Sequence, residues 1–291
     1  MTTTIPSEPD SRGTKDRRPL NTIETTRYLD RPDGRVGYDV GGEGPLVVLV
    51  PGMGDLRTAY RFVAPALRVA GYRVACTDLR GHGDSDATFD SYGDVDTAGD
   101  VIALIEELGD PAVIVGNSMA AGSAVIVAAQ RPELVTGLVL IGPFVRDPDT
   151  TMLQRILLRA AMARPWAAAS WKAYLPKLYT GQRPADFDHY RDQVVASIRR
   201  TGHTKAFSLT TRTSHAIAEA GLADVGAPTL VIMGDQDPDF PDPQAEADWI
   251  AQAVGGQVVL IPEAGHYPQS QRADLTTRAL LGFLAGLNDH A

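Results

Sequence analysis

Apolar residues in the first half of the chain gather in short continuous runs instead of alternating with polar ones. A strand that is buried on both faces produces such a run, because both of its sides are apolar. The clearest runs are LVVLV at 46–50, YRVACTD at 72–78, AVIV at 112–115 and LVTGLVLIG at 134–142. We therefore expect several buried strands of one sheet. Two more strands, TRYLD and RVGYDV, are predicted around the turn residues of RPDG.

The segments between these runs have helical spacing of apolar residues. A helical pattern covers residues 57–70, another covers 93–108 with acidic residues between the apolar ones, and an Ala-rich helix is predicted at 118–130. Strands that alternate with helices are joined by right-handed crossovers. The pattern predicts an α/β protein with a mostly parallel central sheet and helices on both of its faces.

This rhythm stops at about residue 143, and no convincing strand follows until about residue 224. The segment contains helical stretches at 151–163, 169–179, 186–200 and, less clearly, 205–220. The α/β pattern then returns with a strand at 228–234, a helix at 243–254, a strand at 257–262 and a helix at 272–287. Open α/β sheets bind ligands at the carboxyl ends of their strands. We therefore interpret the inserted helices as a cap over that edge.

The chain divides, on this interpretation, into a tail, a core and a cap. The tail comprises residues 1–24, which are polar, rich in Thr, Ser and Pro, and without the apolar stretch of a signal peptide. The core comprises residues 25–142 and 225–291, and the cap comprises residues 143–224. The longest apolar stretches are too short to span a membrane. A cytoplasmic location is expected.

Composition and charge exclude some partners. The chain has 27 basic and 36 acidic residues, a net charge of −9, which repels phosphate backbones and anionic lipid. Nucleic acid and membranes are therefore not expected as partners. Cys76 is the only cysteine and lies in an apolar run, so we expect a core residue and no intrachain disulfide. No Cys/His pair has metal-ligand spacing, so no metal is expected.

The most informative short stretch is GNSMAAGS at 116–123, which directly follows a predicted strand. The small residues Gly116 and Ala120 lie two positions before and after Ser118. A sharp strand-to-helix turn requires small residues there, because bulkier side chains beside a strained backbone would clash. Such a serine could be a nucleophile, or it could simply cap the helix. The sequence at other strand ends decides between these two interpretations.

Three more strand ends carry reactive or flexible groups. The strand at 46–50 ends in PGMGD, whose glycines let backbone N–H groups face a cleft. The strand at 228–234 ends in Asp235-Gln236-Asp237, and the strand at 257–262 is followed by Glu263-Ala264-Gly265-His266. A serine, an acid and a histidine thus follow one another in chain order, each beyond a strand of the sheet.

These residues resemble the α/β-hydrolase fold with an inserted helical cap, over most of residues 25–288. The family's nucleophile elbow is usually G-x-S-x-G, and the stretch DLRGHGDSD resembles the loop after its fourth strand. The family's G-x-x-D pattern falls on Asp237 rather than Asp235 or Asp239, and its G-H motif falls on His266. Ala120 replaces the second glycine of the elbow, and Pro51 stands where many members have histidine.

The resemblance implies acyl transfer by a catalytic triad. His266 would take the proton of Ser118, Asp237 would orient the imidazole, and Ser118 would attack a carbonyl. The backbone N–H groups of Met53 and Met119 would hold the oxyanion. The partner would be a small-molecule acyl substrate, and neither a metal nor an organic cofactor is expected.

The other histidines have simpler interpretations. His82 lies between two glycines and is predicted to shape its loop. His189, His203 and His215 lie in the predicted cap and are expected at the surface.

The nucleophile type narrows the possible reactions. Dehalogenases and epoxide hydrolases of this fold use an aspartate at the elbow, whereas serine favours carbonyl substrates such as an ester, lactone or thioester. GNSM also resembles the elbow of meta-cleavage-product hydrolases, which cut carbon–carbon bonds. Those enzymes usually carry Trp after the histidine, where this chain has Tyr267, and a longer glycine-rich oxyanion loop. A third possibility is a ligand receptor that keeps the triad but does not turn over.

Overall fold

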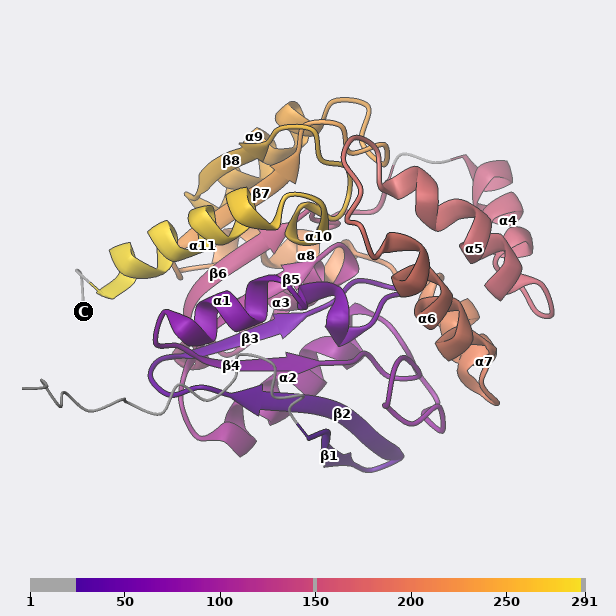
Figure 1. Ribbon diagram of the computed structural model, residues 1–291, viewed down its shortest axis with the longest axis horizontal. Helices are drawn as coiled ribbons and strands as arrows, with labels where there is room; N and C mark the ends of the chain where they lie inside the picture. Colours follow the sequence, from indigo (N-terminus) through magenta and orange to yellow (C-terminus); the bar gives the residue numbers. More distant parts are fainter. Residues whose placement is uncertain (1–24, 149–150, 289–291) are drawn as a thin grey trace, which may run out of the picture.

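The centre of the protein is an eight-stranded sheet with the order β1-β2-β4-β3-β5-β6-β7-β8 (Figure 1). The computed structural model describes residues 25–148 and 151–288. The strands are β1 Arg27–Arg31, β2 Gly34–Gly41, β3 Leu46–Val50, β4 Arg73–Thr77, β5 Ala112–Asn117, β6 Val135–Ile141, β7 Thr229–Gly234 and β8 Gln257–Ile261. β2 is antiparallel to both β1 and β4, and every other pair is parallel. The predicted α/β class and mostly parallel sheet are confirmed.

The register of the central strands brings their carboxyl ends to one edge. Val50 of β3 pairs with Gly116 of β5, and Asn117 of β5 pairs with Ile141 of β6. All residues of β3, β5 and β7 are buried, which explains their continuous apolar sequences. The loops that follow these strands therefore begin next to one another at the same edge of the sheet.

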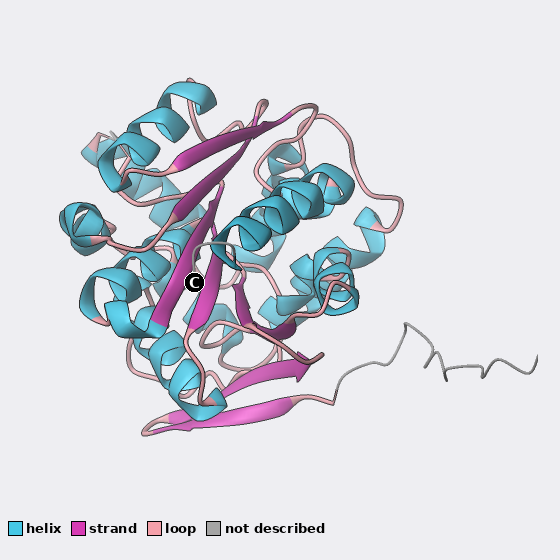
Figure 2. Cartoon of the chain, turned by 90° about the vertical axis from the view of Figure 1, so that its left-hand side faces the viewer, coloured by secondary structure: helices cyan, strands magenta, loops and turns pink. Residues whose placement is uncertain are grey.

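Helices cover both faces of the sheet, as Figure 2 shows. One face carries α2 Asp94–Leu108, α3 Met119–Gln130 and α9 Pro243–Val254, whose buried side chains form one core cluster. The other face carries α1 Val63–Val69 and α11 Ala273–Asn288, which belong to a second cluster. The short helices are η1 Arg57–Tyr60, η2 Pro132–Leu134, η3 Leu222–Asp224 and α10 Pro268–Gln271.

Among the described residues, five α-helices and the short η3 lie between β6 and β7. The α-helices are α4 Met152–Ala161, α5 Ala167–Leu178, α6 Phe187–Arg199, α7 His203–Thr210 and α8 Ala216–Gly221. The first four lie together beyond one end of the sheet in Figure 1. By contrast, α8 packs on α3, and its Ala218 is part of the core cluster on that face. The last part of the predicted cap thus lies with the core.

Several predicted boundaries change. The segments expected as single helices at 57–70 and 205–220 are each divided into two, and α10 precedes the final helix. The tail predicted at 1–24 lies outside the described residues, and the division into core and cap stays a prediction. Within the part of the chain that the structure describes, no helix has the length and apolar content needed to cross a bilayer.

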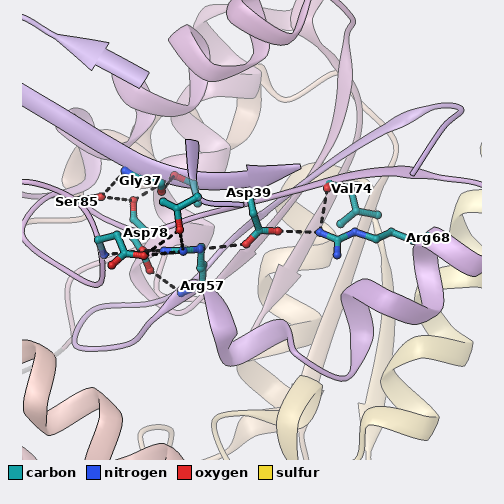
Figure 3. A network of polar contacts seen from close by, with 10 residues as sticks. Gly37, Asp39, Arg57, Arg68, Val74, Asp78 and Ser85 are labelled. Carbon is teal, nitrogen blue, oxygen red and sulfur yellow. Dashed lines mark hydrogen bonds and ion pairs between the residues drawn. The ribbon is translucent and has the colours of Figure 1, made fainter. Parts of the chain in front are cut away.

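A buried polar network anchors the segment that follows the PGMGD loop (Figure 3). The Arg57 guanidinium forms ion pairs with Asp39, at 3.1 Å, and with Asp78, and the Arg57 backbone N–H donates to Asp78 at 2.8 Å. Arg68 donates to the second oxygen of Asp39 at 2.8 Å. The side chain of Asp78 is fully buried. Arg57 therefore joins β2, the loop after β4 and η1.

We expect Arg57→Ala to lower the free energy of unfolding by about 3–5 kcal/mol, because it leaves the buried Asp78 carboxylate without its cation. Urea denaturation measures this change. Arg35→Ala is the matched control, since its ion pair with Asp86 is largely exposed, and such pairs contribute only about 0–1 kcal/mol. Equal losses in the two variants would contradict the role given to the network.

Candidate active site

Ser118 occupies a strained turn between β5 and α3. Its φ is 59° and its ψ is −126°, values that a residue with a side chain rarely adopts. The turn leaves no room for larger neighbours, since a Cβ on Gly116 would lie 2.3 Å from the Ala120 carbonyl oxygen. A Cβ on Gly52 would lie 2.7 Å from the Ser118 Cβ. The Ser118 side chain makes no capping hydrogen bond to α3, so the capping interpretation is not supported.

His266 and Asp237 form a buried pair on the loops after β8 and β7. The His266 Nδ1 lies 2.8 Å from Asp237 Oδ2 and 3.7 Å from Asp239 Oδ2. The backbone holds the histidine through its N–H, which donates to the Leu178 carbonyl of α5 at 2.9 Å. Because a carboxylate accepts at Nδ1, the hydrogen bonding assigns the proton to Nδ1 and leaves Nε2 as the basic nitrogen.

Opposing effects act on the charge of this histidine. Burial by itself lowers the pKa of His266, but the adjacent carboxylates, Asp237 first and Asp239 next, raise this pKa above its ordinary range. Asp239 is held by the Tyr174 hydroxyl of α5, which donates to it at 2.8 Å. The protonated form of the His266 ring is therefore stabilised.

Shared neighbours connect the Ser118 turn with the histidine. The Asn117 side chain donates to the Ile141 carbonyl at 2.9 Å and to the His266 carbonyl at 3.3 Å. The Phe144 N–H donates to the Ser118 carbonyl at 3.2 Å, and the Phe144 ring lies 5.8 Å from the His266 ring. Among the described residues, no hydrogen bond joins the Ser118 hydroxyl to His266. Catalytic hydrogen bonds often tighten only when substrate binds.

Backbone N–H groups are available near the serine. The N–H groups of Met53 and Met119 donate no hydrogen bond within the described part of the chain. Gly54, the residue after Met53, is held through both its N–H and its carbonyl group. Its N–H donates to His82 Nε2 at 3.1 Å, and its carbonyl accepts from Trp171 Nε1 at 2.8 Å.

His82 and Asp55 support the same loop from buried positions. Burial lowers the pKa of His82 to about 4, so its ring is neutral and can accept from Gly54. This contact agrees with the predicted loop-shaping role. Burial raises the pKa of Asp55 to about 6, although the hydrogen bonds that the Tyr190 hydroxyl and the Leu56 N–H donate to this carboxylate act to lower its pKa. Tyr190 belongs to α6, so two helices from the inserted segment contact the loop.

The expectation that the cap histidines lie at the surface is wrong for two of the three. His203 is buried, with Nδ1 2.9 Å from the Gly81 carbonyl oxygen, and His215 is buried, with Nδ1 2.7 Å from Asp94. His189 is exposed. The partners of the buried pair are more than a hundred residues away in sequence, and no local pattern marks them.

Only one group of potential metal ligands is present among the described residues, and it coincides with this site. Asp237, Asp239 and His266 offer ligand atoms that lie within 4.8 Å of one another. The hydrogen bond between Asp237 and His266 already uses the nitrogen that faces these carboxylates. The cluster therefore fits an acid–base pair, and the expected absence of a metal stays a prediction.

Known proteins resemble this chain in sequence and in structure. The 2-hydroxy-6-oxononadienedioate/2-hydroxy-6-oxononatrienedioate hydrolase of Comamonas testosteroni is 29% identical over 86% of this chain and 91% of its own length. The 2-hydroxy-6-oxo-6-phenylhexa-2,4-dienoate hydrolase of Burkholderia cepacia is 28% identical over the same shares. The crystal structure of a bromoperoxidase from Bacillus anthracis has a TM-score of 0.78 at 21% identity, over 90% of this chain and 99% of its own.

A family model described as the alpha/beta hydrolase family matches residues 47–279, which contain Ser118, Asp237 and His266. The eight-stranded, mostly parallel sheet with helices on both faces is consistent with that match. This chain belongs to the alpha/beta hydrolase family.

Proposed function

We propose that the protein is a serine hydrolase that cleaves a small-to-medium apolar carboxylic ester, lactone or thioester through an acyl-enzyme. The observation that carries the proposal is the buried His266–Asp237 pair beside a strained, uncapped Ser118. A triad of this kind makes a serine hydroxyl nucleophilic, because the histidine accepts its proton as the bond to carbon forms.

Each residue has a defined part in the proposed reaction. His266 Nε2 takes the Ser118 proton while Ser118 Oγ attacks the carbonyl carbon. Met53 and Met119 donate their free N–H groups to the oxyanion, and His266 then gives the proton to the leaving group. Water, activated by the same histidine, attacks the acyl-enzyme and releases the acid. Asp237 keeps the ring oriented throughout.

The charges around the histidine favour a neutral substrate. The charged groups that act on His266 are the carboxylates of Asp237, Asp239 and Asp55. An anionic substrate would be repelled by these groups. Aromatic rings lie beside the site, with Phe144 5.0 Å from Phe240. These features support an uncharged, apolar acyl group.

A second candidate is hydrolysis of a carbon–carbon bond beside a ketone. It is favoured by the GNSM elbow and by the two dienoate hydrolases that resemble this chain. Tyr267 after the histidine, the short PGMGD loop and the carboxylates near His266 count against it. We therefore place it after ester hydrolysis.

Steady-state rates with two substrate classes test the proposal. We expect repeated turnover of p-nitrophenyl acyl esters, with medium chains preferred to acetyl, and slower or no cleavage of a 2-hydroxy-6-oxo-dienoate. Faster cleavage of the dienoate would favour the second candidate. A single turnover per protein molecule would instead indicate a ligand receptor. Acetyl esters hydrolysed as fast as medium ones would contradict the apolar acyl group.

The contact between α5 and the oxyanion loop gives a further prediction. Trp171→Phe removes the hydrogen bond to Gly54 but keeps most of the ring packing, so the Met53 N–H should lose its fixed position. We expect kcat for the ester to fall about tenfold with little change in KM, because the donor acts mainly in the transition state. Trp166→Phe, in an exposed position, should leave kcat unchanged. Equal kcat values in the two variants would contradict this role.

A further inference from the structure

Helix α4 has an apolar surface that the other described residues leave uncovered. The side chains of Met152, Leu153, Ile156, Leu157 and Leu158 are between 50% and 75% exposed. In Figure 1 the helix lies at the outer side of the group of helices α4–α7. Burial of large apolar side chains is the main favourable term in folding and association. An apolar helix that stays exposed in this way marks an interaction surface.

The apolar residues of α4 are concentrated on one side of the helix. Successive residues in an α-helix are rotated by about 100°. Met152, Leu153, Ile156 and Leu157 therefore share one face, which we call the α4 apolar face. Leu158 points to the opposite side of the helix.

The charge of this region is opposite to that of the whole chain. Residues 151–185 contain six basic residues and no acidic one, whereas the net charge of the chain is −9. Arg159 of α4 and Arg164, shortly after the helix ends, are both exposed, and Trp166 is 53% exposed. A basic amphipathic helix with a nearby tryptophan has the composition of segments that lie in the membrane interface.

We propose that α4 docks onto an anionic lipid surface. The α4 apolar face enters the boundary between headgroups and acyl chains, Arg159 and Arg164 contact lipid phosphates, and Trp166 lies at the headgroup level. The acidic remainder of the protein is repelled by the same lipids, so the molecule binds with the α4 side toward the membrane. This proposal differs from the expectation, based on the net charge of the whole chain, that membranes are not partners.

The charges favour lipid over a second copy of the chain as the occupant. A symmetric dimer through the α4 apolar face would place the same patch on both subunits. The facing surface of the second copy would be the same basic region, which has no acidic residue between 151 and 185 to neutralise Arg159 and Arg164. Anionic headgroups neutralise these arginines instead.

Flotation with lipid vesicles tests the proposal without any substrate. We expect the protein to float with vesicles that contain about one third phosphatidylglycerol, and not with pure phosphatidylcholine, and to dissociate at high salt. Leu153→Glu should weaken binding about tenfold or more, because it puts a charge on the α4 apolar face. Leu158→Glu is the matched control and should bind like the unmodified protein, since this leucine points away from the lipid.

Fluorescence adds an independent measurement. Anionic vesicles should shift the emission to the blue, and Trp166→Phe should remove most of this shift. Trp171 is buried and Trp249 of α9 packs against the core, so only Trp166 would enter the interface. No flotation, equal binding to both kinds of vesicle, or equal loss in the two leucine variants would overturn the proposal. The proposal would also be overturned if the protein formed a dimer that Leu153→Glu dissociates and did not bind to vesicles. The Ser118→Ala variant should float with anionic vesicles like the unmodified protein, so lipid binding is tested independently of the proposed hydrolysis.

Discussion

Replacement of Ser118 by alanine is expected to reduce kcat for ester hydrolysis by about 10⁶-fold, because no other group in the turn can form the acyl-enzyme. The fold should be retained. The side chain makes no capping hydrogen bond, and alanine at a φ of 59° carries the same backbone strain as serine. Circular dichroism and steady-state kinetics measure the two quantities on one preparation.

A buried serine in the same helix provides the control. The Ser123 hydroxyl donates to the Met119 carbonyl inside α3, at 3.5 Å, and is not exposed. Ser123→Ala should keep nearly full turnover and should still be labelled by a fluorophosphonate, whereas Ser118→Ala should not be labelled. Unmodified turnover in Ser118→Ala would show that another residue is the nucleophile.

The strands were predictable because each is a local sequence feature with a single physical cause. LVVLV matches β3 from its first to its last residue, since every side chain of that strand is buried. The helices were less predictable at their ends. The pattern at 57–70 continues through η1 and α1, but the chain turns between them after Tyr60, whose hydroxyl donates to the Val50 carbonyl. Such a contact with the sheet is not encoded in local spacing.

The candidate site likewise has features that local sequence predicts and features that it does not. Its positions were predictable from motifs at strand ends, because parallel strands place these ends at one edge. Its supports were not. Trp171 and Gly54 are 117 residues apart, and Tyr190 and Asp55 are 135 residues apart, so only the folded chain reveals these hydrogen bonds. The choice between Asp237 and Asp239 came from a family pattern, while the distances to His266 give a physical reason for it.

Asp237→Asn should lower kcat for ester hydrolysis by about 10⁴-fold without unfolding the protein. The amide can donate its own N–H to His266 Nδ1, which moves the ring proton to Nε2, the nitrogen that must accept from Ser118. Asp239→Asn is the matched control. Asp239 lies 3.7 Å from the same nitrogen and makes no hydrogen bond to it within the described residues, so we expect less than about a tenfold loss.

The pH profile separates this role from simple structural damage. The carboxylates raise the pKa of His266, so the imidazolium persists to higher pH, and kcat/KM of the unmodified enzyme should fall as the pH decreases through that raised pKa. Loss of the Asp237 charge lowers the pKa, because burial then acts with less opposition. The residual activity of Asp237→Asn should therefore decline only at a lower pH than that of the unmodified enzyme. If Asp239→Asn instead gave the larger loss and the larger shift of the profile, the acid that orients His266 would be Asp239. Tyr174 of α5, whose hydroxyl donates to that carboxylate, would then support the acid of the triad.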